Sequence, residues 1–163
     1  MKNNELFEIA QRISNILPSL DKIKGAKFHY ALLKNIDLLQ KEITLIQTKS
    51  KPSDKFTEYE KLRIALCEQH ANKDDQGLPK KRDMGNGQFE FDIDTEAESW
   101  KTAIEKLKGE NAEIVAERDE QIKQYNDLLE VDSDIKFHLI KLEDIPNDVN
   151  GEQMQALRFW IYS

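Results

Sequence analysis

A long, regular apolar stripe in residues 95–130 constrains the fold of this chain more than any other feature. The stripe repeats at a period near 3.6, the spacing of a straight amphipathic helix packed on a partner. Its members are Trp100, Ile104, Leu107, Asn111, Ile114, Arg118, Ile122, Tyr125 and Leu129. A strict 3.5 period fits less well, which disfavours a long supercoiled coiled coil. Roughly 36 residues at ~1.5 Å each form a rod of about 54 Å, and we expect much of the remaining chain to line up beside it.

Local signals refine this predicted helix of residues 95–130. Thr95 and Glu98 have the spacing of a capping box, so the helix is expected to begin at Thr95. Gly109 costs about 1 kcal/mol relative to Ala inside a helix. It therefore indicates either the close approach of another backbone or a gentle bend.

Three further helices are predicted in the N-terminal half. The first spans about 4–17 and is expected to stop at Pro18. The second spans about 26–49 and carries two apolar stripes, which indicates a central helix with neighbours on more than one side. The third spans about 55–72, capped by Ser53 or Asp54. It shows apolar residues on two different faces, and the pattern does not decide whether it folds back on the second helix or runs on.

Short strands are predicted in two places. Residues 79–84 and 88–93 form a β-hairpin around Gly85-Asn86-Gly87, since Gly and Asn tolerate positive φ. Residues 135–142 form a further strand, in which the apolar positions change face after Leu139, as a bulge or two buried faces would require. Whether these strands share a sheet stays open. A last helix over about 151–160 is capped by Asn150 with Gln153.

These elements predict a mainly α fold: an elongated antiparallel helical bundle or helical hairpin with a small β-hairpin or short sheet. A chain of 163 residues is long enough to bury a core, and we expect a single domain over 1–163. Hydrophobic residues make up 39% of the chain and charged residues 34%, a polar balance that suits elongated helices with a large surface.

The net charge of −7 is unevenly spread along the chain. Residues 1–50 carry 8 basic and 5 acidic side chains, whereas residues 95–130 carry 5 basic and 10 acidic side chains. We therefore expect a basic N-terminal helical layer near an acidic helix. One cysteine, Cys67, excludes an internal disulfide, and the chain has neither a long apolar run nor a signal-peptide pattern, so a cytosolic protein is expected.

Possible metal ligands have simpler structural explanations. Cys67 and His70 lie three residues apart on a predicted helix, but a closed zinc site needs four ligands and the chain holds one Cys and three His. An acidic run precedes the long helix, where carboxylates complement the helix dipole; its members are Asp92, Asp94, Glu96 and Glu98. No metal or cofactor is predicted.

Two segments are candidate interaction surfaces. In the last helix Phe159, Trp160 and Tyr162 cannot all be hidden beneath one short helix, so some should meet another surface, in this chain or in a partner. The basic triplet Lys80, Lys81 and Arg82 on the hairpin can guard a sheet edge or contact phosphate. We expect a protein partner or self-association; nucleic-acid binding through the triplet and the basic N-terminal layer is the alternative.

No phosphate-binding loop, nucleophile elbow or paired zinc motif occurs in the sequence. A non-enzymatic role is therefore expected. A small-ligand binder or enzyme with a pocket near His29 or His138 is the second alternative, since catalytic groups can assemble in space.

Several short motifs are similar to those of small uncharacterised proteins encoded by tailed bacteriophages and prophages. The resemblance covers about residues 25–157 and rests on Lys27-Phe28-x-Tyr30-Ala31-Leu32-x-Lys34-Asn35, Tyr59-Glu60 with Arg63, Lys73-Asp74-x-x-Gly77, Ile140-Lys141-Leu142-Glu143-Asp144-Ile145-Pro146 and Glu152-Gln153-Met154. It implies the cytoplasm of an infected bacterium and carries no known activity. Helix, hairpin and helix in succession also resemble a prefoldin subunit in outline.

Overall fold

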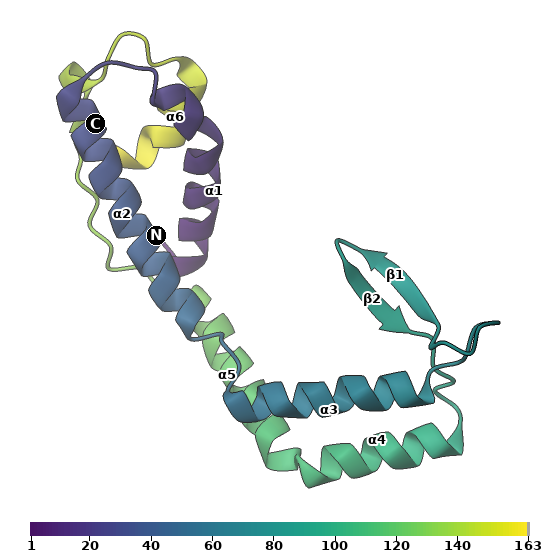
Figure 1. Cartoon of the computed structure of the whole chain (residues 1–163). Helices are drawn as coiled ribbons and strands as arrows, with labels where there is room; N and C mark the ends of the chain where they lie inside the picture. The colour runs from purple at the N-terminus through teal and green to yellow at the C-terminus, as the bar shows by residue number, and fades with distance from the viewer. Residues whose placement is uncertain (163) are drawn as a thin grey trace. The chain divides into compact units, whose positions relative to one another are not determined.

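The computed structural model describes residues 1–162 and is mainly α-helical with two small sheets, which confirms the expected fold class (Figure 1). Its helices and strands are α1 (Asn3–Leu20), α2 (Ala26–Thr48), α3 (Asp54–His70), β1 (Lys81–Gly85), β2 (Gln88–Phe91), α4 (Glu98–Glu110), α5 (Ala112–Leu129), β3 (Ile140–Lys141), α6 (Gly151–Leu157) and β4 (Ile161–Tyr162). Single 3₁₀ turns, η1 (Leu142–Asp144) and η2 (Arg158–Trp160), precede and follow α6.

The contacts between residues that are close in space divide the chain into two compact units. The core unit comprises residues 1–51 and the chain from Lys123 onward, and the hairpin unit comprises residues 52–122. The boundary falls inside α5, and α2 and α3 belong to different units. The expected single domain over 1–163 stays a prediction.

Aliphatic side chains on α1 and α2 form most of the interior of the core unit. Figure 1 shows these two helices side by side, with α6 next to α1. The buried residues recur three or four positions apart, which places them on one stripe of each helix; they are Leu6, Ile9, Ile13, Ile16 and Leu20 on α1, and Phe28, Ala31, Leu32, Leu39 and Ile46 on α2. Fully burying one such side chain contributes about 1.5–3 kcal/mol.

Pro18 lies inside α1, and the predicted helix end at residue 17 is wrong. A proline removes one backbone donor and disfavours the helical conformation of the residue before it. Here the final turn is nevertheless held, because Leu20 is buried in the core and the Asp21 amide donates to the Leu17 carbonyl at 3.1 Å. Tertiary packing therefore outweighs the local signal.

The segment 135–142 is mostly not a strand, and only Ile140–Lys141 (β3) pairs, in parallel, with β4. Asn35 on α2 replaces the missing neighbour strand. Its fully buried side chain donates to the His138 carbonyl at 2.8 Å and accepts from the His138 amide at 2.7 Å. The expected bulge or pair of buried faces is absent, since Leu139 and Leu142 are both exposed and only Ile140 is buried. In the described chain β3 and β1–β2 belong to separate sheets.

The N-terminal residues are tied to the end of α5 and the segment after it. The backbone amide of Asn3 donates to the Val131 carbonyl at 2.9 Å, and its side chain donates to the Leu128 carbonyl at 2.9 Å. Lys2 forms an ion pair with Glu130. This contact depresses the pKa of the Glu130 carboxyl, chiefly through the hydrogen bond from Lys2, and raises the pKa of Lys2.

In the hairpin unit, α3 and α4 run antiparallel and lie side by side (Figure 1). The His70 and Trp100 rings are 5.7 Å apart at one end, and the Arg118 guanidinium lies 5.6 Å from the Phe56 ring at the other. The Ser53 side chain accepts from the Phe56 amide at 3.2 Å, which confirms Ser53 as the cap of α3.

The predicted unbroken helix of residues 95–130 is wrong, because Asn111 interrupts it. Asn111 adopts φ −119° and ψ 19° between α4 and α5, and its side chain donates to the Leu107 carbonyl at 2.9 Å. The side-chain amide of Asn111 thus satisfies a carbonyl of the last turn of α4, as side chains commonly do where a helix ends. A Cβ at Gly109 would meet nothing within 4 Å, so no other backbone approaches there.

The predicted capping box of Thr95 and Glu98 is also absent. The helix begins at Glu98, with Ala97 as the capping residue and no side-chain cap. Asp94 instead accepts from the Glu96 amide at 3.0 Å, a local turn that aspartate favours. This turn occupies the residues that the sequence pattern assigned to the first helical turn.

The predicted β-hairpin is confirmed, with shorter strands than the expected 79–84 and 88–93. Asn86 and Gly87 form the turn at φ 53° and 75°, and Gly85 has φ 84°, so the Gly-Asn-Gly signal has its expected physical basis. At the C-terminal end the reciprocal bonds of Asn150 and Gln153 are present. The predicted helix of 151–160 divides into α6 and η2.

We predict that Asn35→Ala lowers the free energy of unfolding by about 2–4 kcal/mol, because two backbone groups of His138 lose their partner in a part-buried site. Urea unfolding followed by circular dichroism measures the change. Gln40→Ala, at an exposed position of the same helix, should stay within about 0.5 kcal/mol of wild type. Equal stability of the two variants would contradict the role of Asn35.

We predict that Glu130→Gln lowers the melting temperature near neutral pH and has no effect in acid. The folded-state pKa of Glu130 lies below its usual value of 4.5. Stability from this group is therefore present above about pH 4.5 and disappears as the pH falls through the lower folded-state pKa. Thermal unfolding at about pH 7 and about pH 3 measures it. Glu42→Gln is the control, and an equal deficit of Glu130→Gln at both pH values would count against this linkage.

Candidate functional site

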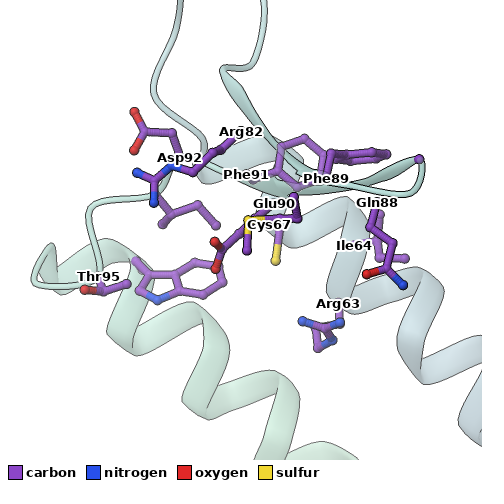
Figure 2. A pocket seen from close by; sticks show the side chains of 14 residues that line it. Arg63, Ile64, Cys67, Arg82, Gln88, Phe89, Glu90, Phe91, Asp92 and Thr95 are labelled. Atoms are coloured by element: carbon purple, nitrogen blue, oxygen red, sulfur yellow. The ribbon is translucent and has the colours of Figure 1, made fainter.

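An open groove in the hairpin unit is the candidate functional site. It has a volume of about 730 Å³ and lies among α3, the β-hairpin and the start of α4 (Figure 2). Apolar side chains from α3, the hairpin and α4 line it, namely Ile64 and Cys67 of α3, Met84 of β1 and Trp100 of α4. These side chains are half-buried or exposed, so the groove presents apolar surface to solvent.

The hairpin presents two chemically different faces. The pairs Arg82–Glu90 and Asp83–Phe89 alternate along the hairpin, and neighbouring side chains of a strand point to opposite faces. Figure 2 shows Glu90 and Gln88 directed toward the helices, whereas the Phe89 and Phe91 rings lie on the other side of the hairpin. One face is thus polar and looks into the groove, and the other is aromatic.

Lys81 covers the aromatic face of the hairpin. The Phe89 and Phe91 ring centroids are 5.5 Å apart, and the Lys81 Nζ lies 4.5 Å and 5.1 Å from them. Such cation–π contacts contribute about 0.5–1 kcal/mol at exposed sites. Lys80, Lys81 and Arg82 are all exposed, and the structure gives Lys81 a role in covering aromatic rings.

Two arginines line the groove, of which one forms an ion pair within the chain and the other does not. The Arg63 guanidinium donates two hydrogen bonds of 2.9 Å to Glu60, which raises the pKa of Arg63. Arg82 has no ion pair among the described residues and lies opposite Glu90 on the hairpin. The groove therefore offers one free guanidinium and the Glu90 carboxylate beside apolar walls, a mixture suited to peptide side chains.

Cys67 is half-buried in the groove wall, and burial raises the pKa of its thiol, partly offset by the nearby Arg63 cation. The thiol is therefore protonated at neutral pH and is a poor nucleophile. His70, three residues on, has its ring against Trp100. Among residues 1–162 no three His, Cys, Asp or Glu side chains gather closely enough to hold a metal ion.

The acidic run beside the groove makes local structural contacts. Asp94 closes the turn described above, and Glu96 pairs with Lys101 at 2.9 Å. Asp92 accepts from the Asn72 side chain at 3.3 Å. These carboxylates hold the junction between β2 and α4.

The predicted aromatic surface at the C-terminal end lies in the core unit and is only partly exposed. Trp160 is fully buried with its ring 5.7 Å from Phe137, so it is unavailable to a partner. Phe159 and Tyr162 are exposed, and Arg158 lies 4.6 Å from the Phe159 ring. Lys80, Lys81 and Arg82 belong to the other unit, the hairpin unit.

The two histidines considered for a pocket have structural contacts instead. The His29 ring hydrogen-bonds with the Ile23 carbonyl oxygen, and the His138 ring lies 6.2 Å from the Tyr30 ring. Neither residue lines the groove.

The whole net charge of the chain resides in the hairpin unit. Residues 52–122 contain 18 acidic and 11 basic side chains, a net charge of −7, whereas the rest of the chain contains 13 of each. The groove therefore belongs to an acidic body, which attracts cationic partners and repels polyanions.

Comparisons with protein-family models, with curated proteins and with solved structures found no match for this chain. Among the described helices, none is both long enough and apolar enough to span a lipid bilayer.

Sequence reasoning identified Arg82 but missed the apolar groove beside it. Met84 lies on the first strand of the predicted hairpin, and Ile64 and Cys67 lie on the second apolar face noted for residues 55–72. That second face was the available signal, since an apolar stripe without an obvious partner marks a surface to be covered.

We predict that iodoacetamide modifies Cys67 more slowly in the folded chain than in the urea-unfolded chain at about pH 8, because the folded thiol has the higher pKa. Arg63→Gln should slow the folded-state reaction further by removing a cation that favours the thiolate. Mass spectrometry follows the single cysteine directly. A folded chain that reacts as fast as the unfolded one would contradict this protonated, half-buried thiol.

Proposed function

We propose that this chain is a non-enzymatic accessory protein that acts by binding another protein through the groove of its hairpin unit. The observation that carries the proposal is an open groove of about 730 Å³ with exposed apolar side chains on two of its walls. Ile64 on α3 and Met84 on β1 are the clearest examples, with exposed fractions of 48% and 59%. Apolar surface gathered around a groove and rimmed by charge is typical of a protein-binding site.

The chemistry of the groove favours a peptide partner over a reaction. Its one thiol is protonated at neutral pH, and its Arg63 is engaged by Glu60. A partner segment with an apolar anchor and a basic side chain fits best, because Glu90 faces the groove and the unit carries a net charge of −7. Burying one apolar anchor of this kind is worth about 2 kcal/mol or more at an interface.

Nucleic acid is the second candidate, through Lys80, Lys81 and Arg82. Three cations give weak, strongly salt-dependent binding, and the surrounding unit is acidic. A protein partner is therefore the better supported occupant. Absence of any gel shift with nucleic acid at about 50 mM salt would exclude nucleic-acid binding by these three residues.

The phage resemblance suggests where such an accessory protein acts. A role in assembly, host takeover or evasion of host defence, in the cytoplasm of an infected bacterium, fits a small binding protein. Neighbouring genes test this setting, since phage genomes group genes by stage of infection.

We predict that full-length chain captures a specific protein from bacterial lysate, and that Met84→Glu reduces this capture at least about tenfold by placing a charge among apolar groove residues. Leu78→Glu is the matched control, because Leu78 is equally exposed in the same unit but does not line the groove. Quantitative mass spectrometry of the bound fraction measures the ratio. Equal capture by both variants, or none by wild type, would sink the proposal.

A further inference from the structure

Helix α3 carries apolar residues on two nearly opposite flanks. Ile64 lines the groove with the β-hairpin, whereas Leu62 lies two positions earlier, about 200° away around the helix. The flank of Leu62 faces away from the β-hairpin groove. It is therefore a second surface, separate from the candidate functional site.

A second hollow, of about 360 Å³, occupies this other flank. Both helices line it with the same spacing of i, i+3, i+4 and i+7, from Leu62 on α3 and from Ala103 on α4. That spacing is the one by which a helix presents a continuous stripe to another helix. Ala65 and Ala103 leave the hollow shallow, while Leu62 projects from it with 55% of its surface exposed.

The hairpin unit lacks a closed interior of its own. Of its apolar residues in 52–122, all of them described, only Tyr59 and Ala71 are buried, and α4 and α5 contribute none. A domain of this size ordinarily buries about 60% of its chain surface. The two helices thus resemble half of a four-helix arrangement, in which two helical hairpins cover each other.

We propose that a second copy of this chain covers the flank of Leu62, Ala65 and Ala103, so that two α3–α4 pairs pack face to face. A two-fold interface uses the same patch on both copies and must contain both a projection and a recess. This patch has both, in Leu62 and in the hollow beside Ala65 and Ala103.

The rim charges of the patch also fit a second copy. Lys106 and Glu110 lie one turn apart on α4, and their own ion pair is long at 3.9 Å. When two α4 helices run antiparallel about a two-fold axis, Lys106 of each copy faces Glu110 of the other. Because the rim carries a positive and a negative side chain one turn apart, it attracts the same rim of a second chain that runs in the opposite direction.

The flank is small for a specific protein interface. A helix of 17 residues is about 25 Å long and two helices are about 20 Å wide, which gives a flank of about 500 Å² per copy. The total of about 1000 Å² stands at the lower limit of specific interfaces. The dimer is therefore weak and reversible, with a dissociation constant of about 10–100 µM. Since each copy carries a charge of −7, added salt strengthens it.

Sedimentation velocity of the full chain at about 1–200 µM, in about 0.15 M and 0.5 M salt, tests the proposal. Wild type should pass from monomer to dimer within this range, at lower concentration in the higher salt. Leu62→Glu should weaken association at least tenfold, and Ala103→Glu on the facing helix should do the same. Ile64→Glu is the matched variant on the opposite flank of α3 and should leave the dimer intact, with helicity checked by circular dichroism.

A wild-type chain that stays monomeric at about 200 µM overturns the proposal, as does equal weakening by Leu62→Glu and Ile64→Glu. Partner capture separates this result from the proposed function. Leu62→Glu should retain the captured protein while losing the dimer, and Ile64→Glu should do the reverse. A monomeric chain that still captures its partner refutes the dimer alone.

Discussion

The pair of hydrogen bonds between the Asn35 side chain and the His138 backbone organises the core unit. One amide supplies both a donor and an acceptor, as a neighbouring strand would, at 2.8 Å and 2.7 Å. This contact sets the phase of the extended segment, so that Ile140 enters the core and Leu139 faces solvent. Ile140 then pairs with Ile161, next to the buried Trp160. An apolar residue at position 35 would leave this segment without its anchor.

The two units differ in net charge and in how completely their apolar side chains are covered. The core unit is electrically balanced and closed around aliphatic side chains, with its N-terminal residues tied to Leu128 and Val131. The hairpin unit carries the full net charge and keeps its apolar side chains half-exposed. Apolar surface left in contact with water lowers the free energy of unfolding of the unit by itself. Covering that surface with another surface would raise the free energy of unfolding again.

Periodic patterns predicted the helices well because each has a continuous apolar stripe, and Gly85-Asn86-Gly87 predicted the hairpin through its backbone conformations. The break at Asn111 escaped prediction because the stripe continues through it in the 3.6 period. The strand at 135–142 was overestimated, since its partner is a side chain about a hundred residues away. The groove depends on three elements meeting in space, which spacing along one chain does not reveal.

Helix α3 has an apolar side chain on each of two flanks, Leu62 on one and Ile64 on the other, and each lines a separate hollow. Tyr59 on the same helix is buried, and Leu66 lines the smaller hollow together with Ala103 and Leu107 of α4. Under the two proposed interfaces, only a narrow strip of this helix is free to vary among related sequences. Although most of its residues look solvent-accessible in a single chain, related sequences should vary there no more than in an ordinary protein interior.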